Sequence, residues 1–244
     1  MERPTFTVPK LPPAASFAAR RAAPRRFPGH VLEASRARGL RYDELEAAED
    51  SHYSCLMPDH VAQVAAAYEA ELGAGWAPRH IIDATANVGC DALNFRRMYP
   101  GAAVTAIELN PATAAALARN AAALGGGRLA AVCGDAAAYL AADPPPQADL
   151  VYYDPPWGGP GYQAAGPLRL ALGGQPLGDV VGRALRGVAG LAVVKAPATA
   201  DLDDLYAAVR RHGGADFAVR DVRKARRNAR GAVAFRLVFA RRRD

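Results

Sequence analysis

The chain has 244 residues, 51% of them hydrophobic, and a formal net charge of +6 at pH 7. This length accommodates one domain with an extension, or at most two small domains, and no apolar run is long enough to span a membrane. The three cysteines are widely spaced and the five histidines lack metal-ligand spacing. They indicate neither a metal site nor a disulfide framework, so we expect an intracellular protein in a reducing compartment.

Positive charge marks both ends of the chain. Residues 1–40 include a segment rich in Pro, Ala and Arg without helical periodicity, and we predict a disordered basic arm there. From Arg210 to the C-terminus there are 12 basic and 3 acidic residues. Such a stretch is either a solvated loop or a phosphate-binding face, and the sequence leaves both readings open. The charge favours a nucleic-acid partner.

Residues 41–75 are predicted to form a helical extension, with a helix from Asp59 to Leu72. Strand and helix patterns alternate over residues 76–244, which we interpret as the main domain. The predicted strands are residues 80–84, 102–109, 128–133, 150–153, 191–195, 217–222 and 232–239. The predicted helices of this domain begin at Asp91 and Pro111, with Asn110 as N-cap of the second, and cover residues 177–188 and 202–209.

This alternation predicts an α/β fold with a mostly parallel sheet of seven strands, covered by helices on both faces. The last two strands have only a short connection, which predicts an antiparallel edge. Ligands of such sheets bind beyond the carboxyl ends of the parallel strands. Carboxylates occur at four successive strand ends: Asp83, Glu108, Asp135 and Asp154. We therefore expect the functional site at this edge.

The first turn favours S-adenosylmethionine over a dinucleotide as the cofactor. The segment from Asp83 to Asp91 contains Gly89 but lacks a complete G-x-G-x-x-G phosphate cradle, and S-adenosylmethionine carries no phosphate. Glu108, 25 residues after Asp83, is expected to accept the ribose hydroxyls, and Asp135 the adenine amine. The predicted cofactor-binding residues are Asp83, Ala84, Thr85, Asn87, Gly89, Glu108, Leu109, Asp135 and Ala136.

The segment Asp154-Pro155-Pro156-Trp157 follows a buried strand and suits chemistry at the exocyclic amine of a flat ring. Asp154 and the Pro155 carbonyl can each accept an amine N–H, which makes the nitrogen lone pair available for attack. Proline keeps this segment rigid. Trp157 offers a face on which the ring can stack. The motif predicts Asp154 and Pro155 as catalytic residues.

The run from Pro155 to Tyr162 resembles the most specific motif of the trimethylguanosine synthase family, the RNA cap guanine-N2 methyltransferases, which has divergent relatives in large DNA viruses. Residues 82–91, Glu108 and Asp135 resemble the family's cofactor motifs, and the likeness extends over about residues 40–244. It implies a Rossmann-like class I methyltransferase that binds S-adenosylmethionine and methylates N2 of guanine in a 7-methylguanosine RNA cap. It further implies Pro156, Trp157 and Tyr162 as substrate-binding residues.

We expect a monomer in the nucleus or cytoplasm (of a host cell, if the chain is viral) without membrane association. Two departures keep alternatives open. Asp154 stands where the family has serine and is more typical of N6-adenine or other amino-methyltransferases. Asn87 and Cys90 replace family glycines, although Asn tolerates the left-handed backbone conformation. These two replacements leave open a cap- or RNA-binding module without catalysis. Protein-side-chain methyltransferases use similar Pro-Pro-aromatic motifs and are a further alternative, against which the basic C-terminal part argues.

Two further residue types have open roles. Lys195 interrupts an apolar strand, and its ammonium either extends to solvent at the strand end or faces the site. Cys90 and Cys133 are expected to be small core residues.

Overall fold

The computed structural model describes residues 44–46, 55–56, 58–158, 166–224 and 231–243. The predicted arm (1–40) and Tyr162 lie outside these residues. The described helices are α4 (Pro58–Leu72), α5 (Cys90–Met98), α6 (Pro111–Leu124), α7 (Ala136–Leu140), α8 (Leu177–Gly187) and α9 (Leu202–Arg210). The strands are β1 (His80–Asp83), β2 (Ala103–Glu108), β3 (Leu129–Cys133), β4 (Leu150–Tyr153), β5 (Ala171–Leu172), β6 (Gln175–Pro176), β7 (Leu191–Pro197), β8 (Ala215–Arg223) and β9 (Val233–Arg242).

The main sheet has seven strands in the order β3-β2-β1-β4-β7-β9-β8. The pairs from β3 through β7 are parallel, and β9 pairs antiparallel with both β7 and β8. The predicted α/β fold with a mostly parallel seven-stranded sheet is confirmed. The reversed strand is β9, which lies inside the edge strand β8, because the β8–β9 connection folds the last strand back between β8 and β7.

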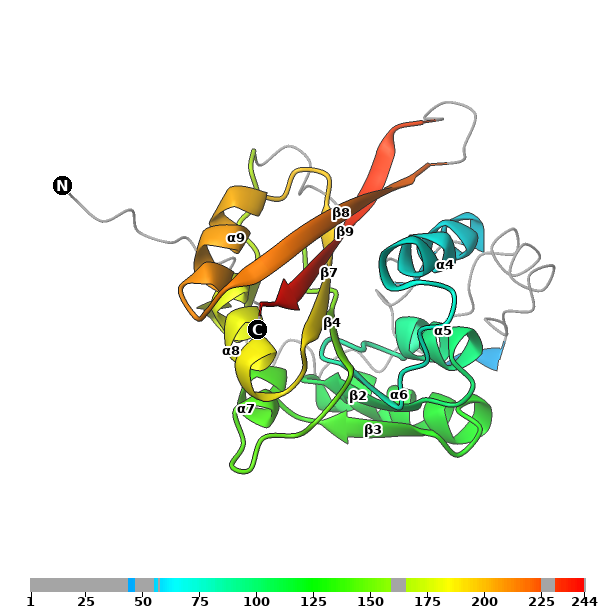
Figure 1. Ribbon diagram of the computed structural model, residues 1–244. Coiled ribbons are helices and arrows are strands. Elements are labelled where there is room, and N and C mark those ends of the chain that lie inside the picture. Colours follow the sequence, from blue (N-terminus) through cyan, green and yellow to red (C-terminus); the bar gives the residue numbers. More distant parts are fainter. Residues whose placement is uncertain (1–43, 47–54, 57, 159–165, 225–230, 244) are drawn as a thin grey trace.

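Helices cover both faces of this sheet (Figure 1). One core cluster joins α4, α5 and α6 to residues such as Ile81, Tyr152 and Val193, and the other joins α7, α8 and α9 to their neighbours Ile82 and Tyr153. Successive side chains of a strand point to opposite faces, so each buried strand contributes to both clusters. No helix in the described part of the chain is both long and apolar enough to cross a membrane.

The predicted caps and boundaries agree with the structure to within a few residues. Asn110 caps α6, and its side-chain oxygen accepts the N–H groups of Ala112 and Thr113. Two features were not predicted: the short helix α7 and the two-stranded hairpin β5–β6. Both are too short for hydrophobic periodicity to reveal them.

The expectations for the cysteines require two corrections. Cys55 and Cys90 form a disulfide with a Cα–Cα distance of 5.3 Å, although their sequence separation of 35 gave no recognisable framework. Cys133 is exposed rather than part of the core. It is the last residue of β3, an edge strand, where fewer neighbours cover the side chain.

Candidate active site

The sheet brings the four predicted carboxylates together at the carboxyl ends of its parallel strands. Asp83 and Glu108 are the last residues of β1 and β2, Asp135 follows β3 by two residues, and Asp154 directly follows β4. The strands β3, β2, β1, β4 and β7 are parallel and adjacent, so their carboxyl ends meet. The predicted location of the site is therefore supported by the topology.

The turn after β1, residues 84–89, is the predicted cofactor turn, and backbone and side-chain hydrogen bonds hold it in place. Asn87 has a φ of 48°, the left-handed conformation expected when asparagine stands in for glycine. Its backbone N–H donates to Oε2 of Glu108 (3.0 Å), and its side-chain oxygen accepts the N–H of Val88 (2.8 Å). The same carboxylate accepts the N–H of Asn110 at Oε1 (2.8 Å). Glu108 thus links the first turn to the second.

Burial raises the pKa of Glu108, while the N–H bonds from Asn110 and Asn87 oppose that rise. Each carboxylate oxygen has two lone pairs, so both oxygens keep capacity for further donors such as ribose hydroxyls. Leu109, beside Glu108, is 59% exposed and stands out among the described residues as an exposed large apolar side chain.

Gly89 is required by packing as well as by backbone conformation. It caps helix α5 with a φ of 99°, and a Cβ atom there would lie 2.8 Å from Cδ1 of Leu117 on α6. The close approach that this glycine permits is therefore between the turn and helix α6.

Asp83 is fully buried. Its Oδ1 accepts the N–H of Thr85 (3.2 Å), whereas its buried Oδ2 has no hydrogen-bond partner within the described residues. Burial, followed by repulsion from Asp91, raises the pKa of Asp83 well above its usual value. An unsatisfied buried carboxyl oxygen is uncommon in a folded protein and calls for an explanation.

Asp135 has a structural role that limits its availability. Its Oδ1 accepts the N–H groups of Ala137 (2.8 Å) and Ala138 (3.4 Å), so it is the N-cap of α7. The turn of the β5–β6 hairpin lies against its other oxygen, because a Cβ atom on Gly173 would be 3.4 Å from Oδ2. Capping thus occupies Oδ1 of Asp135, and the hairpin turn limits the space beside its carboxylate.

Asp154 is held at two points. Its backbone N–H donates to Oγ1 of Thr85 (2.6 Å), which joins the Asp-Pro-Pro-Trp segment to the cofactor turn. Its Oδ2 accepts from Nζ of Lys195 (2.7 Å), and both side chains are almost completely buried. Burial raises the pKa of Asp154, whereas attraction to Lys195 lowers it.

A buried network lies beneath Asp154. Nζ of Lys195 is 3.5 Å from Oδ2 of Asp91, which also accepts the hydroxyl of Tyr152 at 2.9 Å. Of the two open readings of Lys195, the structure supports the one in which it faces the site. Neither Asp91 nor Tyr152 was predicted as a site residue. The signal for Lys195 was its place in an apolar strand of a chain with only three lysines.

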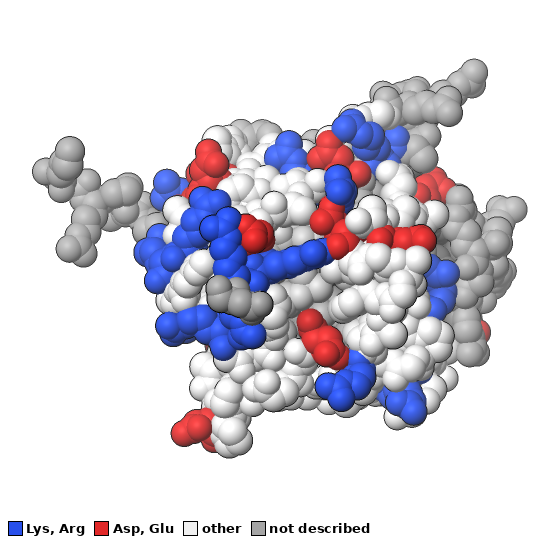
Figure 2. Space-filling model, in the orientation of Figure 1, with Lys and Arg blue, Asp and Glu red and all other residues white. Residues whose placement is uncertain are grey.

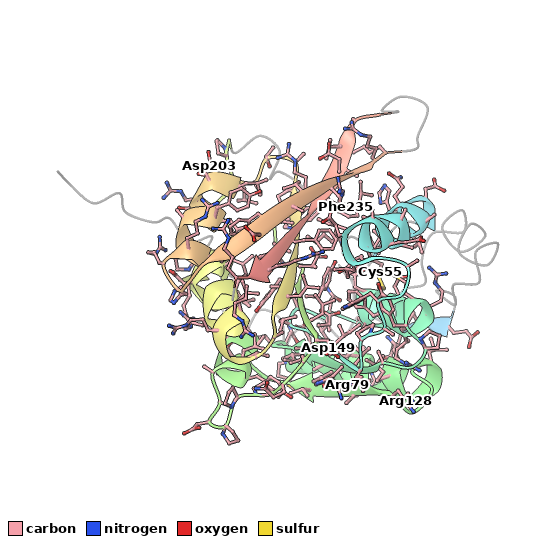
Figure 3. All side chains as sticks on the ribbon, viewed as in Figure 1. Cys55, Arg79, Arg128, Asp149, Asp203 and Phe235 are labelled. Atoms are coloured by element: carbon pink, nitrogen blue, oxygen red, sulfur yellow. A yellow bond between two sulfur atoms is a disulfide. The ribbon has the colours of Figure 1, made fainter. Side chains whose placement is uncertain are left out.

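Aromatic rings border this network. The ammonium of Lys195 lies 6.0 Å from the ring centre of Trp157 and 5.3 Å from that of Phe235, and the Phe235 ring meets the imidazole of His60 edge-on at 5.4 Å. Figure 3 shows Phe235 on β9 on the side of helix α4. Trp157 is half-buried and contacts both core clusters, so part of the residue packs on the core and part of it is exposed.

A small pocket connects the cofactor turn with the amine-directed motif. Its lining includes the disulfide, the turn and the carboxylate that follows β4: Cys55, Thr85, Ala86, Asn87, Val88, Cys90, Asp91 and Asp154. Figure 3 shows Cys55 between helices α4 and α5. The structure thus brings together the predicted residues of the turn and Asp154, with Pro155 buried and Pro156 exposed beside it.

The sheet register divides the basic C-terminal part. Arg241 pairs with Leu191, the first residue of β7, whereas Phe235 pairs with Pro197 at the carboxyl end of β7. Arg241–Arg243 therefore lie at the end of the sheet opposite the site, while Arg223 and Lys224 lie at the same end as the site. Figure 2 shows basic residues gathered over α8 and α9 and a smaller group towards the end of the β8–β9 hairpin.

Solved structures show the same fold at low sequence identity. A putative RNA methyltransferase, PH1948 from Pyrococcus horikoshii, is 10% identical with a TM-score of 0.54, covering 87% of this chain and 98% of its own. A SAM-dependent methyltransferase from Agrobacterium tumefaciens is 18% identical with a TM-score of 0.52, covering 77% and 62%. The [4+2]-cyclase SpnF is 14% identical with a TM-score of 0.51, covering 76% and 82%. These likenesses establish the fold alone.

The sequence itself identifies the family. No curated protein matches the chain. Residues 78–229, more than half of the chain, match the RNA cap guanine-N2 methyltransferase family, and this region contains the cofactor turn, Asp154 and Lys195. The chain therefore belongs to the RNA cap guanine-N2 methyltransferase family of enzymes.

Proposed function

We propose that this protein transfers a methyl group from S-adenosylmethionine to the N2 amine of guanine in a 7-methylguanosine RNA cap. The observation that carries the proposal is the position of Asp154. It lies at the carboxyl end of β4, three residues before the half-buried Trp157. Its backbone N–H donates a hydrogen bond to the Thr85 hydroxyl of the cofactor turn. An amine acceptor, a stacking ring and a cofactor turn are thereby within one site.

The residues of the turn fit S-adenosylmethionine. Oδ2 of Asp83 would bind the ammonium of the methionyl part, because it is a buried oxygen without a partner among the described residues. Glu108 would accept the ribose hydroxyls, and Leu109 would contact the adenine ring. When bound, the cofactor supplies an electrophilic methyl group on a sulfonium. The proposed cofactor set also includes Ala84, Thr85, Asn87, Gly89, Asp135 and Ala136, and the proposed substrate set Pro156 and Tyr162.

Asp154 and Pro155 would act on the substrate amine. One N–H would donate to Oδ1 of Asp154 and the other to the carbonyl of Pro155, which draws the nitrogen towards a tetrahedral geometry. The nitrogen lone pair would then form a bond to the methyl group that the cofactor supplies, and the electron pair of the broken methyl–sulfur bond would leave with the cofactor. The amine gains positive charge in this step, and a carboxylate beside it stabilises the change. The proton lost from nitrogen passes to water.

Helix α4, within the proposed extension of residues 41–75, would form a wall on the substrate side. The side-chain amide of Gln63 accepts the N–H of Arg223 (2.9 Å) and donates to its carbonyl (2.9 Å), and His60 contacts Phe235. These contacts attach the extension to the β8–β9 hairpin on the side of the site. A flat base stacked on Trp157 would thus be close to α4. A cationic 7-methylguanine also gains attraction to an indole face.

Methyl transfer from labelled S-adenosylmethionine to paired RNAs tests the proposal. One RNA carries a 7-methylguanosine cap and the other an unmethylated guanosine cap, and the digested products identify the methylated atom. We expect label at N2 of the 7-methylguanosine cap only. Label on adenine or within the RNA body would assign the site to another amino-methyltransferase. The variant Asp154→Ala should bind S-adenosylmethionine as the wild type does and lose turnover, and retained turnover would exclude the role of Asp154.

A further inference from the structure

Lys195 is a buried cation in an apolar strand. Every residue of β7 is buried, and Lys195 itself is 4% exposed. Burying an ammonium group is unfavourable unless other charges compensate it, and an apolar residue would serve strand packing better at this position. The pairing of Tyr153 with Val194 aligns β4 with β7 so that Asp154 and Lys195, the next residues of each strand, lie side by side.

The two oxygens of Asp154 have different surroundings. Oδ2 accepts the short bond from Lys195. Oδ1 has no hydrogen bond to any of the described residues. It is also not one of the fully buried side-chain atoms that lack a hydrogen-bond partner within that part of the chain. Asp154 also lines the small pocket, together with residues of the cofactor turn. The ion pair thus occupies one oxygen and leaves the other accessible.

We propose that Lys195 is a positioning residue for methyl transfer, which fixes Oδ2 of Asp154 so that Oδ1 accepts the substrate amine. This inference rests on the proposed function, because it assigns Asp154 as the amine acceptor. Without the Lys195 bond, the carboxylate would be free to turn about its Cβ–Cγ bond, and the acceptor oxygen would no longer be held in one orientation towards the amine. Correct alignment of reacting groups is a large part of the catalysis available to an enzyme that forms no covalent intermediate.

Asp91 and Tyr152 hold the lysine in turn. Nζ of Lys195 lies between Asp154 and Asp91, and the Tyr152 hydroxyl donates to the same oxygen of Asp91. Among the described residues, one ammonium is thus shared by two carboxylates. This excess of negative charge favours the positive charge that develops on the substrate amine.

Lys195 also keeps Asp154 ionised. Burial and Asp91 both raise the pKa of Asp154, and Lys195 is the charge that lowers it. The other titratable groups packed around the pair are His60 on α4, Asp83 on β1 and Tyr152 on β4. Burial and the charge of Lys195 lower the pKa of His60. Removing the lysine charge should therefore raise the pKa of Asp154 further.

The variants Lys195→Met and Lys195→Arg test this role through the dependence of kcat on pH. We expect Lys195→Met to move the acid limb by one pH unit or more to higher pH and to lower kcat at least tenfold at neutral pH. Its affinity for S-adenosylmethionine, measured by calorimetry, should stay within a few-fold of the wild type. Lys195→Arg should restore the acid limb. If Lys195→Met does not fold, Lys195→Gln keeps a donor, lacks the charge and provides the same comparison.

A direct titration of Asp154 separates this inference from the proposed function. Carboxyl carbon NMR can follow the ionisation of Asp154 in the wild type and in the lysine variants without any RNA, with Asp154→Asn to assign its signal. An upward shift in Lys195→Met that Lys195→Arg reverses supports the positioning role, even if a substrate other than the cap is methylated. An unchanged titration together with an unchanged kcat profile overturns the role of Lys195, whichever RNA is methylated.

Discussion

Cys55 is joined by a disulfide to Cys90, so the segment before helix α4 is covalently attached to the first residue of α5. Both cysteines also line the pocket that contains Asn87 and Asp154. The extension and the cofactor turn are therefore linked through the site itself. Any change in the redox state of this pair acts on the wall of the pocket.

We expect Cys55→Ser to lower the free energy of unfolding by about 3–4 kcal/mol under oxidising conditions, the loop-closure contribution for a sequence separation of 35. Urea unfolding with and without a reducing agent measures this. In the presence of reductant the wild type and the variant should have the same stability. Cys133→Ser is the matched control, because Cys133 is exposed and unpaired with either of the other cysteines. A stability difference that persists in reductant would contradict the prediction.

Asp83 is expected to reduce stability as the pH rises. The folded state holds the Asp83 proton more tightly than the unfolded chain, where aspartate has a pKa of about 3.9. Its contribution to the free energy of unfolding therefore falls, by up to about 1.4 kcal/mol per pH unit, from about pH 4 up to the folded pKa. Asp83→Asn removes this titration, so its stability relative to the wild type should increase with pH.

The same variant should lose cofactor affinity. If Oδ2 of Asp83 binds the ammonium of S-adenosylmethionine, Asp83→Asn weakens binding by about tenfold or more, because a charge-assisted hydrogen bond is replaced. Calorimetric titration and chemical unfolding at pH 5 and pH 7 measure the two effects. Asp203→Asn, on the exposed N-terminal turn of α9, controls for the loss of one negative charge. Undiminished cofactor affinity in Asp83→Asn would remove Asp83 from the cofactor site.

Asn87 should be replaceable by glycine but not by alanine. Its left-handed backbone costs an alanine roughly 1–2 kcal/mol, whereas glycine adopts it freely. Both variants lose the hydrogen bond from the Val88 N–H to the side chain, so that bond does not contribute to the difference between them. We expect Asn87→Ala to be less stable and to bind S-adenosylmethionine more weakly than Asn87→Gly, since its strain displaces the N–H that donates to Glu108. Equal unfolding free energies for the two variants would refute this explanation.

The sequence predicted what depends on neighbouring residues. The strand and helix patterns, the Asn110 cap and the left-handed turn at Asn87 are local, and all four are present in the structure. The placement of Asp83 and Asp154 at one edge followed from the rule for parallel sheets. The position of Asp135 just after a strand was also predicted from the local sequence, although the structure shows that helix capping uses one of its oxygens.

The remainder required information that the linear sequence does not contain. Lys195 meets Asp154 only because β4 and β7 are neighbours in a specific register, across 41 positions of sequence. Cys55 meets Cys90 only because α4 and α5 cover the same face of the sheet. The division of the basic residues between two edges depends on the reversal of β9. In each case a long-range pairing sets the contact, and composition or periodicity cannot specify it.

The separation of the basic residues between the two ends of the sheet predicts that they differ in their effect on RNA binding. Lys224 lies on the site's side of the hairpin, close enough to His60 to lower the pKa of that imidazole, whereas Arg243 lies at the opposite edge and pairs with Asp216. Lys224→Ala should weaken binding of capped RNA several-fold and reduce the slope of log affinity against log salt by about one, the effect of losing one phosphate contact. Arg243→Ala removes the same charge and should leave both quantities unchanged. Fluorescence anisotropy over a salt series measures them, with S-adenosylmethionine affinity as a check on folding. Equal effects of the two substitutions would mean that the RNA responds to net charge rather than to this edge of the sheet.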